Sequence, residues 1–371
     1  MLKQILADLV RINSISSRSN VEMIEYLEGR CAALGLKTRR YPYQDELGIE
    51  KINLVALSAG VDEIELALVG HTDTVPYDPH WSEATNLTER DGKLYGRGSC
   101  DTKGFIAAAL TAVADVKINK PLALIFTADE EIGLRGAKQL AQAKPLRVRY
   151  SIVGEPTSLK PIRAGKGYSL AEVIVKGREA HSAYPALGAS AVFRAARLIN
   201  RLESIAEQLT QDQHPAFDPP YTTLNIGLIR GGSAKNVLAG ECRFTLEWRP
   251  IPTQPSERVL ELLHAAIEAE RQLDPELECE VDASRQDTGF ETAPDSRLIK
   301  LLESATGNES GTVSFGTEAA QMMALGSEAV VIGPGDIREA HRTGEFVPID
   351  ELERCAEVLR RAVREICGNA D

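Results

Sequence analysis

The sequence predicts an α/β protein of two domains, a mostly parallel α/β domain with a ferredoxin-like α+β domain inserted into it. The first observation is length, because 371 residues exceed the roughly 250–300 at which a single core usually stops growing. The second is the apolar pattern, which alternates helical segments with short buried runs near both ends of the chain. The third is a middle stretch whose strands have one polar face.

The first 165 residues or so alternate helices with buried strands. Apolar residues recur at helical spacing in one stripe, formed by Ile24, Leu27, Cys31 and Leu34. Another helix is expected near 104–116. Uninterrupted apolar runs predict strands at ELALVG, LALIFT and YSIVG. This alternation favours helices packed on a largely parallel sheet.

The middle of the chain has strands of a different kind. In CRFTLEW and LECEV, apolar and polar residues alternate strictly, which is typical of antiparallel sheets with one solvated face. The expected order is strand (168–176), helix (187–206), strand (222–229), strand (241–249), helix (256–272), strand (277–283). This is the β-α-β-β-α-β order of ferredoxin-like domains.

The first pattern resumes towards the end of the chain. AVVIG predicts another buried strand, and the last helix has a stripe of Ile349, Leu352, Ala356, Leu359, Val363 and Ile366. We therefore expect a discontinuous α/β domain over residues 1–166 and 285–371. The inserted domain is expected over 167–284.

Composition narrows the cellular setting and the class of partner. The net charge of −12 argues against a nucleic-acid partner and suits a small cationic ligand. No apolar run is long enough to cross a bilayer, and Lys3 and Asp8 interrupt the start of the chain where a signal peptide would be apolar. We expect a cytoplasmic protein without a membrane partner. The six cysteines form no CxxC pair, and Cys242 and Cys279 fall on the apolar phase of strands, so buried reduced thiols are expected.

Polar side chains gather where the predicted strands of the first domain end. They are His71 after ELALVG, Asp129, Glu130 and Glu131 after LALIFT, Glu155 after YSIVG, His341 after AVVIG, and Asp101 before a helix. Ligands of open α/β sheets bind beyond the carboxyl ends of the strands. Any one of these residues alone is more often an ordinary loop residue. Their convergence on one sheet edge favours a functional site.

The residue types indicate a metal-dependent hydrolytic site. Two imidazoles and several carboxylates, with no thiolate, suit Zn²⁺, Co²⁺ or Mn²⁺. Three ligating carboxylates against two divalent ions leave one positive charge, which a bridging hydroxide would neutralise. Such a two-metal centre activates water and polarises a carbonyl group. One neighbouring carboxylate must remain free of metal to act as general base.

Several motifs together resemble the co-catalytic metallohydrolases of the M20 peptidase and deacylase type, along nearly the whole chain. They are GHTDTVP, LYGRGSCDTKG, TADEEIG, VGEPT, GREAHSAYP and EAHRTGEFV. The resemblance implies two metal ions, Zn²⁺ above all, one held by His71, Asp101 and Glu155 and the other by Asp101, Glu131 and His341. It also implies Glu130 as general base and acid, and Asp73 as the residue that orients His71.

The same resemblance assigns residues of the inserted domain and a homodimer. It implies that His181, from the partner subunit, stabilises the oxyanion, and that Asn236 and Arg249 bind the substrate carboxylate. Gly316 and Thr317 would add polar contacts beside the metals. For His181 a hydrogen-bonded loop histidine remains open, for Arg249 a solvated arginine, and for Thr317 a helix cap.

Within that family, the sequence resembles the deacetylases that act on N2-acetyl-L-ornithine. The stretches that carry this narrower likeness are GHTDTVPYDPHW, VGEPTSLKPIRAGKGY, YTTLNIGLIRGGSAKN and IGPGDIREAHRTGEF. The alternatives within the family are an acetylcitrulline deacetylase, a succinyl-diaminopimelate desuccinylase and a general aminoacylase. Outside enzymes, an amino-acid-binding protein on the same fold remains an alternative.

Overall fold

The computed structural model describes residues 1–368 and divides the chain into two compact units. The first unit comprises Met1–Arg163, Glu291–Gly311 and the chain from Thr317 onward, and the second comprises Ala164–Phe290 and Thr312–Gly316. The predicted fold class is confirmed, because an α/β sheet with a parallel centre of four strands and a separate α+β unit are both present. The sequence placed the boundaries at 166/167 and 284/285, so residues 164–166, 285–290 and Thr312–Gly316 are assigned to the second unit only by the structure.

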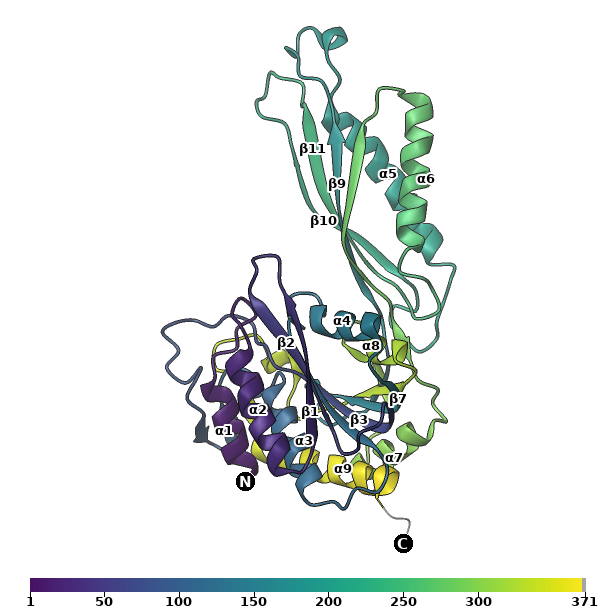
Figure 1. Cartoon of the computed structure of the whole chain (residues 1–371). Helices are drawn as coiled ribbons and strands as arrows, with labels where there is room; N and C mark the ends of the chain where they lie inside the picture. The colour runs from purple at the N-terminus through teal and green to yellow at the C-terminus, as the bar shows by residue number, and fades with distance from the viewer. Residues whose placement is uncertain (369–371) are drawn as a thin grey trace. The chain divides into compact units, whose positions relative to one another are not determined.

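A nine-stranded sheet has most of its strands in the first unit (Figure 1). Its strands are β1 (Lys37–Gln44), β2 (Glu50–Leu57), β3 (Glu63–His71), β6 (Leu122–Thr127), β7 (Arg147–Val153), β8 (Ile162–Gly165), β13 (Phe290–Glu291), β14 (Gly311–Val313) and β15 (Glu328–Val331). Their order is β1-β2-β6-β3-β7-β15-β8-β13, with β14 paired to β8. The four neighbours β6, β3, β7 and β15 are parallel, so their carboxyl ends lie at one edge.

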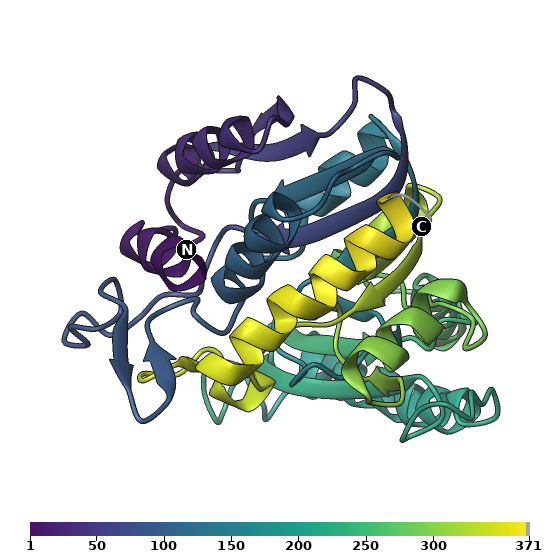
Figure 2. The same ribbon diagram turned by 90° about the horizontal axis from the view of Figure 1, so that it is seen from below.

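Helices cover both faces of this sheet (Figure 1). One face packs against α1 (Leu2–Arg11), α2 (Val21–Ala33), α3 (Lys103–Ala114), α7 (Arg297–Thr306) and α9 (Ile349–Cys367), which share the largest apolar core. Figure 2 shows α9 running alongside α3. The other face packs against α4 (Arg135–Ala143) and α8 (Ala319–Ala324). The apolar stripes predicted for α2 and α9 are the buried faces of these two helices.

Two features of the first unit escaped the sequence prediction. β1 pairs with β2 in an antiparallel hairpin. No pattern in the sequence predicted β1, because KTRRYPYQ has no apolar alternation and lies half exposed at the sheet edge. A separate antiparallel sheet is formed by β4 (Thr88–Arg90), β5 (Lys93–Tyr95) and β16 (Phe346–Pro348). Strands of three residues are too short to show a period in the sequence. Short 3₁₀ helices lie at Pro185–Leu187 and Ile337–Glu339.

The second unit is a four-stranded antiparallel sheet with two helices on one face. Its elements are β9 (Tyr168–Lys176), α5 (Ala191–Leu209), β10 (Thr223–Gly231), β11 (Glu241–Arg249), α6 (Arg258–Leu273) and β12 (Cys279–Asp287). The strand order is β10-β11-β9-β12. The apolar phase of β9 and β11 packs against α5 and α6 around Phe244 and Trp248. The element order is the one that the alternating segments predict.

All six cysteines are free thiols, and five of them are buried. Cys279 is only partly buried, which corrects the expectation for this residue. It lies on β12, an edge strand of its sheet, so one side of the strand has no neighbour to cover it. Within residues 1–368, no helix combines the length and apolar character needed to cross a membrane.

Candidate metal centre

The carboxyl edge of the parallel strands carries most of the candidate ligands. His71 is the last residue of β3, Glu130 and Glu131 follow β6 by a short turn, and Glu155 follows β7. β3 lies between β6 and β7, with His71 paired to Thr127 in register. Because the three strands are parallel neighbours, residues just beyond their ends are brought together.

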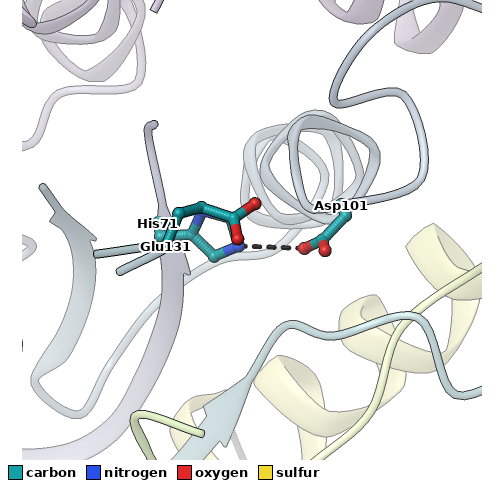
Figure 3. A group of neighbouring side chains, drawn as sticks. All are labelled: His71, Asp101 and Glu131. Atoms are coloured by element: carbon teal, nitrogen blue, oxygen red, sulfur yellow. Dashed lines mark hydrogen bonds and ion pairs between the residues drawn. The ribbon is translucent and has the colours of Figure 1, made fainter. Parts of the chain in front are cut away.

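His71 and Asp101 form the closest contact in this group. His71 is 1% exposed, and its Nε2 lies 3.0 Å from Oδ1 of Asp101 (Figure 3). Its Nδ1 lies 3.0 Å from the backbone carbonyl oxygen of Asp73. A carbonyl oxygen can only accept, so Nδ1 carries the proton and donates it. This tautomer directs the lone pair of the neutral ring at Nε2 towards Asp101 and any ion bound there.

Asp101 contacts a second imidazole through its other oxygen. Oδ2 of Asp101 lies 3.2 Å from Nε2 of His341, and that nitrogen lies 3.0 Å from the Glu131 carboxylate. Asp101 is 5% exposed, whereas the His341 side chain is half exposed. One carboxylate that presents each of its oxygens to a different imidazole has the arrangement needed to bridge two ions.

His71, Asp101 and Glu131 meet a geometric requirement for metal binding. Each of the three offers one ligand atom, and these atoms all lie within 4.8 Å of one another (Figure 3). The sequence assigned Glu131 to the ion of His341 and Glu155 to the ion of His71. In the structure Glu131 approaches both imidazoles. Glu155 is buried nearby, where the charges of Asp101 and Glu130 help to raise its pKa.

Proton affinities in this group show a surplus of buried negative charge. Burial, reinforced by neighbouring carboxylates, raises the pKa of Glu130, Glu131 and Glu155. Burial disfavours the charged form of His71, but its contacts with Asp101 and Asp73 outweigh that effect and raise its pKa. Hydrogen bonds to Asp101 and Glu131 raise the pKa of His341 to about 10. Divalent cations would replace these protons, so the donor set fits a metal centre.

Asp73 contacts His71 through its backbone carbonyl and, at a longer distance, through its carboxylate. Its carboxylate lies 3.7 Å from Nδ1 of His71, farther than its own carbonyl oxygen. The carboxylate instead accepts hydrogen bonds from the backbone N–H groups of Glu130 at 3.0 Å and Glu131 at 3.3 Å, and from the Ser16 hydroxyl at 2.7 Å. The carbonyl of Asp73 therefore orients His71, and its carboxylate holds the turn that carries Glu130 and Glu131.

A buried ion pair that the sequence analysis missed supports the same turn. Nζ of Lys51 lies 2.7 Å from Asp129, and both side chains are at most 1% exposed. The Tyr43 hydroxyl also donates to Asp129, at 2.9 Å. The sequence signal was a lysine at the start of the apolar strand β2. Because Asp129 directly precedes Glu130, these contacts limit the positions that the Glu130 carboxylate can take.

Comparisons with known proteins agree with this arrangement. Residues 67–365 match the model of peptidase family M20/M25/M40. Acetylornithine deacetylase from Myxococcus xanthus is 52% identical over 99% of this chain and 98% of the relative. The enzyme of that name from Yersinia pseudotuberculosis is 36% identical over 96% and 93%. The chain belongs to peptidase family M20/M25/M40.

Solved structures share the fold of this M20 protein. A tripeptidase from Staphylococcus aureus has a TM-score of 0.77 at 23% identity, covering 98% of this chain and 97% of that one. A Bacillus subtilis protein described as a dinuclear metal-binding peptidase from the M20 family has a TM-score of 0.68 at 14% identity, covering 98% and 97%. At such low identity these likenesses show the fold alone.

Two predicted substrate-site residues of the M20 chain lie together in the second unit. The loop of His181 pairs with the loop of Asn236 through a bridge between His181 and Val237 and a 3.0 Å hydrogen bond from the Ser182 N–H to the Asn236 carbonyl. Nδ1 of His181 accepts a hydrogen bond from the Ala183 N–H at 3.1 Å, so Nε2 of the neutral ring is a donor. Both side chains are exposed.

Arg249 lies far from that pair. It ends β11, whereas Asn236 precedes the first residue of β11, and nine residues of strand span roughly 26 Å at about 3.3 Å per step. Nε of Arg249 donates to Glu247 at 2.8 Å, Nη1 donates to the Ser314 carbonyl at 3.0 Å, and the guanidinium lies over the Tyr168 ring. Within one chain, Asn236 and Arg249 are therefore too far apart to bind the same carboxylate.

Gly316 and Thr317 have unequal structural roles. Thr317 is 2% exposed, and its hydroxyl accepts a hydrogen bond from the Ala319 N–H at 3.2 Å at the start of α8. This contact holds the turn just before α8, whose N-cap residue is Glu318. A Cβ atom at Gly316 would lie 3.5 Å from Cβ of Tyr168, an ordinary contact, so packing does not require glycine there.

Glu318 is a further buried acid that the sequence analysis missed. It is 0% exposed, and neither carboxyl oxygen makes a hydrogen bond of normal geometry within the described chain. Burial raises its pKa to about 7, although the charge of His71 lowers it. The negative charge of Glu318 also contributes to the raised pKa of Glu130 and Glu155. No motif singled it out, because one acid after a glycine and a threonine is unremarkable.

Glu318→Gln should remove a pH dependence from the stability of the metal-free protein. Between about pH 4.5 and 7 the folded state keeps a proton on Glu318 that the unfolded state loses, so this group destabilises the fold as pH rises across that window. In urea unfolding, the free energy of unfolding of the variant minus that of wild type should be larger at about pH 7 than at about pH 5. We expect this increase to be on the order of 1–3 kcal/mol. An equal difference at both pH values would contradict the raised pKa.

Proposed function

We propose that this chain is a metal-dependent deacetylase that hydrolyses N2-acetyl-L-ornithine to L-ornithine and acetate, a step of arginine biosynthesis in the cytoplasm. The observation that carries the proposal is 52% identity, along nearly the full length of both chains, with an enzyme named acetylornithine deacetylase. The buried cluster of His71, Asp101 and Glu131 supplies metal ligands of the type that amide hydrolysis requires.

Two divalent ions, with Zn²⁺ preferred, would be held by two imidazoles and three carboxylates. We assign one ion to His71, Asp101 and Glu155, and the other to Asp101, Glu131 and His341. The contacts of Asp101 with both imidazoles support its role as the bridge. When bound, the ions would lower the pKa of water and polarise the amide carbonyl.

Glu130 is the proposed general base and acid. Its backbone is held by the Asp73 carboxylate, and burial raises its pKa well above the usual range of a glutamate, which strengthens its affinity for a proton. In the proposed reaction Glu130 takes a proton from the attacking water molecule. The C–N bond of the tetrahedral intermediate then breaks, and Glu130 donates that proton to the departing amine.

A homodimer would complete the substrate site. β10 is a sheet edge in the second unit, and its side chains Leu228 and Ile229 are 61% and 55% exposed. Pairing of this edge with its own copy would cover them and give a two-fold assembly. His181 and Asn236 would then act in the site of the partner subunit, and Arg249 in the site of its own. This division removes the difficulty that Asn236 and Arg249 lie at opposite ends of β11.

Glu130→Gln should keep the metals and lose turnover. The amide preserves the shape of the side chain but cannot take a proton, and general acid or base catalysis is typically worth about 10² to 10⁴ in rate. Steady-state kinetics and metal analysis of the same preparation measure the two effects together. Near-normal turnover in a fully metallated variant would refute the assignment, and loss of metal would indicate that Glu130 is a ligand.

Mixing His181→Ala subunits with Glu130→Gln subunits should restore activity that neither variant has alone. Each heterodimer would contain one site with both an intact Glu130 and an intact partner histidine. Subunits are exchanged under mild denaturation, and heterodimers are isolated by two different affinity tags before assay. Absence of activity in purified heterodimers would exclude a contribution of His181 across the interface.

Acetyl-ornithine should be the best substrate among N-acyl amino acids. A buried polar acceptor left unpaired by a neutral side chain costs about 1–3 kcal/mol. This corresponds to roughly 5-fold to 150-fold in kcat/KM over an isosteric apolar substrate. The assay compares kcat/KM for acetyl-ornithine, at one metal loading, with the values for acetyl-citrulline, acetyl-methionine, succinyl-diaminopimelate and a dipeptide. A higher kcat/KM for any of these compounds would refute acetyl-ornithine as the preferred substrate. The proposed hydrolytic chemistry would stand.

A further inference from the structure

Glu345 is a buried carboxylate beside the metal centre to which none of the roles above applies. It is 0% exposed and lies four residues after His341, immediately before β16. Its Oε1 accepts hydrogen bonds from two successive backbone N–H groups, those of Cys100 at 3.0 Å and Asp101 at 3.1 Å. One oxygen of Glu345 therefore fixes the peptide units on both sides of Cys100.

The other oxygen of Glu345 pairs with Arg97. Nη1 of Arg97 lies 2.5 Å from Oε2, and Nη2 donates to the carbonyl of Pro76 at 3.2 Å. Arg97 is 3% exposed, so the ion pair is screened little by water. Pro76 ends the GHTDTVP segment that begins at Gly70. Arg97 thus connects Glu345 to the segment that carries His71.

These contacts join the three segments that carry His71, Asp101 and His341. The segments are 70–76, 97–101 and 341–345, and 244 residues separate Glu345 from Asp101 in the sequence. A bridging carboxylate must keep its two oxygens within a few tenths of an ångström of both ions, because metal–oxygen bonds are short and directional. Asp101 has no regular strand or helix to hold its backbone, since α3 begins only at Lys103.

We propose that Glu345, neutralised by Arg97, is the positioning residue that fixes the bridging ligand Asp101, so that metal affinity depends on it. The inference rests on the proposed metal centre but not on the substrate. Pairing with Arg97 lets Glu345 accept the two N–H groups without adding net negative charge beside Asp101, Glu131 and Glu155. A neutral side chain at 345 would leave Arg97 as an uncompensated buried cation near the ions.

The test is metal binding by Glu345→Gln in the full-length protein, without substrate. Co²⁺ is titrated into metal-free protein, followed by visible absorption, and bound metal is counted after dialysis against buffered Zn²⁺. We expect the apparent dissociation constant to rise about 10-fold to 100-fold, which is the usual cost of losing a residue that orients a metal ligand. The Co²⁺ absorption band should also change shape, because the bridging geometry changes.

Glu270→Gln is the matched control. Glu270 is a buried glutamate of the second unit, 3% exposed, that accepts from Nε of Arg197 at 2.9 Å and Nε of Arg201 at 2.6 Å. The Glu270→Gln variant loses a comparable buried ion pair at a position far along the chain from every candidate metal ligand. Its Tm should therefore fall while its metal affinity stays at the wild-type value. Equal metal affinity in Glu345→Gln and wild type would overturn the proposal.

Two milder variants keep the proposal testable if Glu345→Gln does not fold. Glu345→Asp withdraws the carboxylate by one methylene group, and Arg97→Lys keeps the charge but cannot contact Glu345 and Pro76 together. Both should weaken Co²⁺ binding several-fold, and unchanged binding in both would refute the proposal. If the variants lose metal affinity while wild type fails to hydrolyse acetyl-ornithine, the substrate assignment fails and the role of Glu345 stands. Wild-type protein that binds no divalent ion would overturn the role of Glu345 together with the metal centre.

Discussion

Repulsion among carboxylates at one sheet edge is the interaction on which the arrangement of the first unit depends. Asp101 and Glu155 are buried, and Glu130 and Glu131 are partly buried, at one edge of a parallel group of strands. At an effective dielectric constant of about 20, two like charges 4 Å apart repel by about 4 kcal/mol. Such a group is stable only with protons or cations between its members. The raised pKa values and the two imidazoles that contact Asp101 are two consequences of this crowding.

The supporting contacts counter that repulsion without filling the site. Lys51 compensates Asp129, Arg97 compensates Glu345, and neither cation reaches the candidate ligands. Backbone N–H groups bind the remaining oxygens, as at Asp73, whose carboxylate holds the turn of Glu130 and Glu131. The turn of Glu130 and Glu131 and the backbone of Asp101 are thus held by hydrogen bonds to buried carboxylates.

The second unit poses a different physical problem, because its candidate residues lie at opposite ends of one strand. His181 and Asn236 share one end through paired loops, and Arg249 ends β11 beside Tyr168. A strand is nearly inextensible, so no side-chain movement brings these groups together. A composite site made from two subunits accommodates this separation, and the exposed apolar edge at β10 is a surface on which such an assembly could form.

Local pattern in the sequence determined the longer helices and buried strands, the order of elements along the second unit, and which polar residues follow which parallel strand. These depend on side chains a few residues apart, as in the stripe of α9 or the alternation in β11. Only the tertiary structure decided that Glu345 binds the backbone of Asp101, that Lys51 neutralises Asp129, and that Glu318 is buried with no hydrogen bond of normal geometry among residues 1–368. Each of these facts depends on the distance between residues far apart in the chain, which is set by sheet order and packing and leaves no periodic trace in the sequence.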